Sequence, residues 1–313
     1  SGIFMPVGWS LELVGFNFAL VAFCGNAIYV CGSTSISWTY GKLMGPRVSL
    51  MDSAFGIGGS LAPLLAGALA LGGYTAVYGY RVLAVVDGLL VVASLGITAK
   101  PNPRFAKTVE ATAGYKELKS GGANDTDTKV RWIAVMLCSV LIIFTDICFS
   151  SVIFWFHSYA TEHLLLEPHV ARTLNTVLWI VFTSIQFFWA WLQKKYDVAL
   201  ILKCIMPLSL VMACTIAVPA SVFGPGVPAA AMILLGLGGG MNALATTLLR
   251  QMSFIGGKAF GVIRIASACG NMLGGASVGC LQPSLGRLAL PCVASTGMAV
   301  DIIILFWMLR IRS

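Results

Sequence analysis

The chain has 313 residues, of which 58% are hydrophobic and only 10% are charged, and its formal net charge is +8. Soluble domains contain about 25% charged residues, so a soluble protein of this composition would have too little polar surface to cover its core. The basic residues lie in short segments between apolar runs. This distribution excludes the continuous basic patch that binding of nucleic acid requires.

Nine segments are long and apolar enough to span a bilayer as helices, which requires about 20 residues each. In chain order they are residues 11–38, 48–71, 77–99, 131–156, 171–193, 199–222, 228–249, 255–282 and 289–309. Such long runs differ from the short alternating strands of membrane barrels. The sequence therefore predicts an all-α, multi-pass integral membrane protein with nine visible transmembrane helices.

The segment 100–130 is the one long polar stretch between predicted helices, and its part 116–129 has the composition of a flexible linker. By count, 16 of the 20 Lys and Arg residues lie in this segment, in the other odd-numbered connections with their flanking helix ends, or in the C-terminal tail. Because Lys and Arg concentrate in cytoplasmic loops, we expect the linker and the C-terminus to face the cytoplasm.

A single cysteine in place of Gly122 tests this orientation in a background without the native cysteines. An impermeant thiol reagent should leave the cysteine unlabelled in intact cells, because the linker is predicted to be cytoplasmic. Permeabilised cells provide the positive control. Labelling before permeabilisation would reverse the predicted topology.

The last three predicted helices resemble the first three. Gly58 and Gly270 are 212 residues apart, as are Gly67 and Gly279, and both copies cross the membrane in the same direction. Two parallel halves of six helices joined by a cytoplasmic linker are the plan of the major facilitator transporters.

On this plan the visible helices are the fourth to the twelfth. Residues 1–99 form an incomplete N-terminal bundle with the end of helix 3 and helices 4–6, 100–130 form the cytoplasmic linker, and 131–313 form the C-terminal six-helix bundle. We therefore expect a chain truncated at its N-terminus, with further helices encoded upstream.

Five motifs occur in the order found in one branch of that superfamily. They are GNAIYVCG at 25–32, FGIG at 55–58, WFHSYA at 155–160, LWIVFT at 178–183 and ASACGNM at 266–272. They resemble the fourth, fifth, seventh, eighth and eleventh helices of the branch that holds the fucose–proton symporters and the sodium-dependent glucose transporter-like proteins.

The resemblance implies transport of a small polar solute, with a sugar favoured, by alternating access. A co-transported proton or sodium ion is the implied partner, together with the lipid bilayer. The alternative is a non-transporting membrane sensor or scaffold, or an inactive remnant of a transporter. An upstream reading frame that encodes three more helices would favour transport.

Charged residues inside predicted helices are the strongest functional candidates, because a charge at mid-membrane costs about 2.5–3.5 kcal/mol. Asp146 lies near the middle of 131–156, and Ser150 follows one turn later on the same face. We expect Asp146 to bind the solute or a proton, with a structural pair to a neighbouring helix as the alternative. Arg264 is expected to hold an anionic group or to pair with Asp146, and the alternative is snorkelling toward the surface.

Other polar positions have a simpler structural interpretation. Residues 49–52 (SLMD) match a capping box, so Asp52 is interpreted as a cap at a helix start. Asp87 and Asp301 occupy equivalent places in the sixth and twelfth helices, and we expect both to make hydrogen bonds to neighbouring helices. Neither is expected to contact the solute.

The fourth helix carries a polar stripe. Asn26, Tyr29 and Ser33 recur at spacings of three and four residues, which places them on one helix face. The stripe is expected to face a water-filled cavity, and helix–helix hydrogen bonding is the alternative.

The resemblance adds three candidates. Trp155 begins the branch's Trp-x-x-x-Tyr pattern, and Gln186 and Asn271 stand where the branch often has Arg and Glu, respectively. All three are expected to lie near the solute or the coupling site.

The glycine-rich runs are not nucleotide sites. Residues 236–240 (GLGGG) lie within an apolar span, with no strand before them and no Lys-Ser/Thr after them. Residues 270–274 and 275–279 match GxxxG helix-packing surfaces. With no nucleophile–base pair and no cluster of metal ligands in the sequence, we expect no enzyme activity, cofactor or metal.

Overall fold

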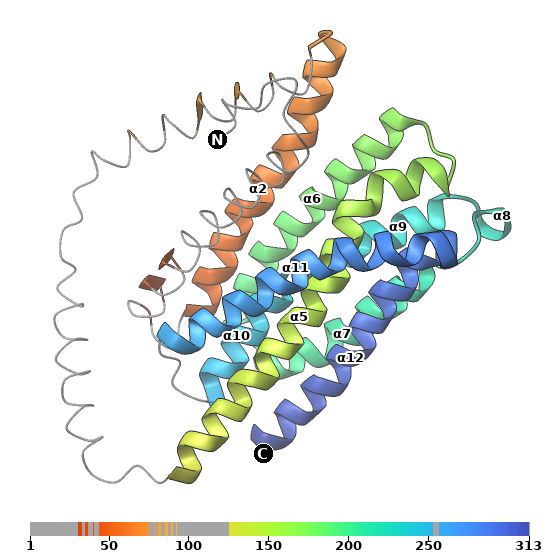
Figure 1. Ribbon diagram of the computed structural model, residues 1–313. Helices are drawn as coiled ribbons and strands as arrows, with labels where there is room; N and C mark the ends of the chain where they lie inside the picture. Colours follow the sequence, from red (N-terminus) through yellow and green to blue (C-terminus); the bar gives the residue numbers. More distant parts are fainter. Residues whose placement is uncertain are drawn as a thin grey trace. The chain divides into compact units, whose positions relative to one another are not determined.

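The computed structural model describes residues 44–74, 125–252 and 257–312, together with isolated positions between 31 and 92 (Figure 1). The chain divides into two units, one of Ser1–Thr39 with Leu61–Gly122 and the other of Tyr40–Ser60 with Ala123–Ser313. Helix α2, Met44–Leu71, passes from the second unit into the first after Ser60. The second unit holds helices α5 to α12.

The described elements of the second unit follow α2 in a simple order. They are α5 (Asp125–Glu162), α6 (Pro168–Leu192), α7 (Val198–Thr215), α8 (Ala220–Phe223), α9 (Gly226–Leu235), the 3₁₀ helix η3 (Gly236–Gly240), α10 (Met241–Met252), α11 (Gly257–Leu285), the 3₁₀ helix η4 (Gly286–Leu288) and α12 (Ala289–Arg312). Every element of the described ranges is helical, as the sequence predicts.

Five segments of the described residues are long and apolar enough to cross a membrane. They are Trp132–Glu162, Pro168–Leu192, Val198–Thr215, Gly226–Met252 and Lys258–Arg312. The last segment contains both α11 and α12, which meet at η4, where Gly286 has a φ of 53° (Figure 1). The six helices predicted after the linker correspond to these segments.

The predicted total of nine helices stays a prediction. The segment 48–71 corresponds to α2, whereas 11–38 and 77–99 lie almost entirely outside the described residues. Hydropathy also misplaces helix ends: α5 begins at Asp125, six residues before the predicted start at 131. Hydropathy marks only the lipid-facing part of a helix, and backbone hydrogen bonding continues into its polar end.

The capping interpretation of Asp52 is wrong. Helix α2 begins at Met44, with Pro46 in its first turn, where the fixed φ of proline suits a helix start. Ser49 and Asp52 therefore lie inside the helix, and both are buried. The Ser49 hydroxyl accepts a hydrogen bond from Gln193 Nε2 at 3.0 Å, so it connects α2 to the end of α6.

Helix α5 is the central element of the second unit and packs against α6, α10, α11 and α12 (Figure 1). Glycines of α11 allow its backbone to approach α5 closely. A Cβ on Gly270 would lie 2.5 Å from the Ile143 carbonyl oxygen, and one on Gly274 would lie 2.6 Å from the Ile147 carbonyl oxygen. The predicted glycine packing surface at 270–274 is therefore confirmed.

The opposite side of α5 packs against α12. Here the Thr145 hydroxyl donates a hydrogen bond to Asp301 Oδ2 at 2.8 Å, and both side chains are buried. The expected hydrogen bond from Asp301 to a neighbouring helix is confirmed. Asp87 lies outside the described residues.

The predicted helix 228–249 is broken at its centre. It consists of α9, the 3₁₀ helix η3 and α10, because four of the five residues 236–240 are glycines, which weaken an α-helix. Side chains of α6 bind the exposed backbone of η3. Gln186 Nε2 donates to the Gly239 carbonyl at 2.8 Å, and Trp189 Nε1 donates to the Leu237 carbonyl at 3.3 Å.

Candidate functional site

Asp146 lies near the middle of the span Trp132–Glu162, and it is 5% exposed. Its direct partner is Asn242, whose Nδ2 donates a hydrogen bond to Oδ1 at 2.6 Å. Among the described residues, the other carboxyl oxygen, Oδ2, is buried without a hydrogen-bond partner. Asn242 thus fixes the carboxyl through Oδ1, and Oδ2 can bind a proton or a hydrogen-bond donor.

Asn242 was missed by the sequence analysis. It is the second residue of α10, two positions after the end of the glycine-rich η3. The signal that could have identified it is an amide side chain inside the apolar segment 228–249, where a polar group needs a partner.

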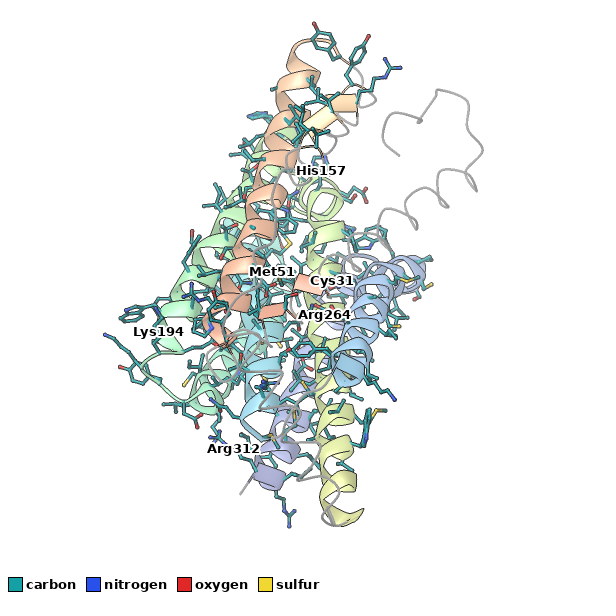
Figure 2. The ribbon with its side chains drawn as sticks, turned by 90° about the vertical axis from the view of Figure 1, so that its left-hand side faces the viewer. Cys31, Met51, His157, Lys194, Arg264 and Arg312 are labelled. Atoms are coloured by element: carbon teal, nitrogen blue, oxygen red, sulfur yellow. The ribbon has the colours of Figure 1, made fainter. Side chains whose placement is uncertain are left out.

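Helix α11 presents polar side chains to the same region. Arg264, Ser267 and Asn271 recur at spacings of three and four residues and so lie on one face. Ser267 contributes a polar group to the surroundings of Asp146, and the Arg264 guanidinium acts electrostatically on its carboxyl. Figure 2 shows Arg264 between the two ends of the bundle, with His157 toward one end and Arg312 toward the other.

The predicted pairing of Arg264 with Asp146 is observed as an electrostatic interaction between the two side chains. Arg264 acts on Asp146 electrostatically, whereas the hydrogen-bonding groups at the carboxyl are the side chains of Ser267 and Asn242. Asp52 of α2 also acts electrostatically on Asp146. Charged groups on two other helices, α2 and α11, therefore act on the Asp146 carboxyl.

An aromatic cluster lies one turn beyond Asp146. The Phe149 ring stacks on Phe182 with centroids 5.0 Å apart, and Trp179 meets both rings edge-on, at 6.5 Å from Phe149 and 5.5 Å from Phe182. The Phe182 ring fits between Gly56 and Gly239, because a Cβ on either glycine would collide with it. Ligand sites commonly combine such rigid aromatic walls with a few placed polar groups.

Two predicted candidates on α5 take part in its packing against α11. The Ser150 hydroxyl donates to the Asp146 backbone carbonyl at 2.5 Å and is buried against Gly274. Trp155 Nε1 donates to the Gly275 carbonyl at 3.0 Å. Both side chains thus stabilise the α5–α11 contact that positions Asp146.

The other candidates are distributed differently. Gln186 is fully buried, and it holds η3 just before Asn242. Asn271 is exposed, and its Nδ2 donates to the Ser267 carbonyl of its own helix at 3.0 Å. Asn26, Tyr29 and Ser33 lie outside the described residues.

Comparison with known families identifies what these helices belong to. The family model of the Major Facilitator Superfamily matches residues 2–275. The chain belongs to the major facilitator superfamily. No curated protein and no solved structure matches it.

Membership in the major facilitator superfamily establishes the broad function. The protein is an integral, multi-pass membrane protein that transports a small solute across the membrane, as members of this superfamily do. Transport is therefore favoured over the alternative of a non-transporting sensor or remnant. Major facilitator proteins bind their solutes between helices near the bilayer midplane, and Asp146 lies near the middle of the candidate span Trp132–Glu162.

Proposed function

We propose that this major facilitator protein transports a small polar solute, with a sugar favoured, by alternating access, and that Asp146 couples this transport to proton movement. The observation that carries the proposal is the buried Asp146 carboxyl, whose Oδ1 accepts a hydrogen bond from Asn242 at 2.6 Å. A buried carboxylate charge is costly, and a proton on the carboxyl removes that charge.

The proton balance of the proposed cycle is simple. The Asp146 carboxylate takes up one proton from the side at which the site is open, and the neutral acid crosses with the bound solute. After the site opens to the other side, the carboxyl releases the same proton. The electrical cost of a bare charge at mid-membrane favours crossing in the neutral form.

Two observations support a sugar-like solute. The half-buried Phe149 ring, backed by the buried Trp179 and Phe182, lies one turn from Asp146, and the exposed Asn271 amide offers donor and acceptor atoms. The sequence motifs also resemble the sugar-transporting branch. Sodium remains the alternative co-ion, because that branch includes both proton- and sodium-linked transporters.

The decisive variant is Asp146→Asn, measured in proteoliposomes with a panel of radiolabelled hexoses and an imposed pH gradient. Uphill accumulation should be lost, because the amide cannot carry the proton. Exchange of labelled for unlabelled hexose should persist, because exchange needs binding but no net proton movement. Asp301→Asn is the matched control, since Asp301 is also a buried carboxyl but accepts its hydrogen bond from Thr145, where α5 packs against α12.

Folded yield separates coupling from a purely structural role. If Asp146 only balances Arg264, Asp146→Asn should lower the folded yield, and the double variant Asp146→Asn with Arg264→Gln should restore it. Normal accumulation by Asp146→Asn would exclude the coupling role. Accumulation that follows a sodium gradient and ignores the pH gradient would identify sodium as the co-ion.

A further inference from the structure

A hollow of about 390 Å³ lies where α7 begins and α12 ends. Its lining consists of Lys203 of α7 and Phe306, Leu309 and Arg310 of α12. Two of these four residues are basic, two are apolar and none is acidic. The hollow therefore combines a positive end with an apolar wall, at a volume within the range of small-ligand sites.

The two helices are fixed to each other at this end. Asp197 caps α7 by accepting a hydrogen bond from the Ala199 nitrogen at 3.4 Å. Arg312 Nη1 donates to both Asp197 carboxylate oxygens, at 3.2 Å and 3.0 Å. Arg312 pairs with Asp197 outside the lining of the hollow, and the basic residues of the lining itself are Lys203 and Arg310.

The hollow lies near one end of two candidate membrane spans, Val198–Thr215 and Lys258–Arg312. Lys203 lies six residues after the cap Asp197, which is about 9 Å along the helix axis. Lys and Arg at this depth extend their charged ends toward the headgroups. On α12, Phe306 is 70% exposed and Ile303, one turn away, is 59% exposed.

We propose that this hollow binds an anionic membrane phospholipid. Its phosphate lies between Lys203 and Arg310, and an acyl chain follows the exposed surface of Phe306 and Ile303. Basic pockets between transmembrane helices on the cytoplasmic side bind anionic headgroups in this manner. The sequence independently predicts that the C-terminus, and with it this end of α12, faces the cytoplasm, where anionic lipids are concentrated.

The test uses the purified full chain in detergent, titrated with dioleoyl-phosphatidylglycerol or dioleoyl-phosphatidylcholine. Bound lipid is counted by native mass spectrometry, and thermal unfolding is followed in parallel. Phosphatidylglycerol should bind at one preferred site and raise the unfolding temperature, and phosphatidylcholine should do so much less. In the double variant Lys203→Ala with Arg310→Ala, affinity should fall on the order of thirtyfold, which corresponds to about 1 kcal/mol for each basic residue.

The matched control is Lys194→Ala with Lys195→Ala, which removes two basic residues from the α6–α7 turn, outside the hollow. This control should retain the preferred site. An equal loss of affinity in the control would overturn the proposal, because it would show general surface attraction. The charge-preserving pair Lys203→Arg with Arg310→Lys should keep binding within about threefold, and it remains informative if the alanine pair folds poorly.

Two further results would also overturn the lipid assignment. If inorganic phosphate or glycerophosphate competes fully with phosphatidylglycerol at equal concentration, the hollow is a site for free phosphate. If phosphatidylcholine binds as tightly as phosphatidylglycerol, charge plays no part in recognition.

Discussion

Gly274→Val is expected to remove most of the folded protein. A Cβ at this position would meet the Ser150 hydroxyl, and it would lie 2.6 Å from the Ile147 carbonyl oxygen and 3.0 Å from the Ser151 nitrogen. Backbone atoms of α5 cannot move aside without separating α5 from α11. Overpacking of this kind costs about 1–3 kcal/mol or more, and in a membrane close helix packing is itself a main source of stability.

The measurement is the monodisperse fraction in fluorescence-detected size-exclusion chromatography, together with the thermal midpoint in detergent. Gly261→Val is the matched control, because it places the same β-branched residue on the same helix. Among the described residues, no atom lies within 4 Å of a Cβ built on Gly261. Equal yields of the two variants would show that the close contact of Gly274 with α5 does not stabilise the fold.

Thr145→Val should destabilise the protein by about 1–3 kcal/mol, because it leaves the buried Asp301 carboxyl without its described donor. The double variant Thr145→Val with Asp301→Val should recover most of the loss. Replacing both members of a buried hydrogen-bonded pair by apolar groups of similar size is nearly neutral, whereas removing one member is not. Thermal midpoints of the single and double variants in detergent measure this difference.

Thr173→Val provides the control for the threonine substitution itself. The Thr173 side chain is exposed and donates only to the His169 carbonyl of its own helix, at 2.9 Å. Its replacement should change the midpoint by no more than about 0.5 kcal/mol in equivalent stability. If the double variant were no more stable than Thr145→Val alone, the bond to Asp301 would not account for the loss.

Hydropathy predicted the membrane helices after residue 130 well, because lipid imposes one strong rule, a continuous apolar run of sufficient length. The rule is insensitive to local backbone geometry. It gave 228–249 as one helix, although the glycines of 236–240 turn its centre into a 3₁₀ helix. It also allowed Ser49 and Asp52 to be interpreted as a cap, because nothing in their own side chains shows that α2 starts at Met44.

The candidate site was predicted in part, for a related reason. Asp146 could be selected from its cost in the membrane alone, since that cost depends only on its own depth. Its partner could not, because the contact with Asn242 joins residues 96 positions apart and depends on how α5 and α10 pack. Gln186 illustrates the same limit: its amide holds the Gly239 carbonyl, a bond that only the tertiary arrangement reveals.

The contact between Asp146 and Asn242 depends on the 3₁₀ conformation of η3, which precedes Asn242 in the chain. A 3₁₀ helix turns by about 120° per residue and rises about 2.0 Å, against about 100° and 1.5 Å for an α-helix. If the five residues Gly236–Gly240 wound into α-helical form, Asn242 would rotate by roughly 100° relative to α9 and shift by about 2.5 Å along the axis. This combined rotation and translation would move the Asn242 amide away from Asp146. The hydrogen bonds from Gln186 and Trp189 to the backbone of η3 oppose such a change.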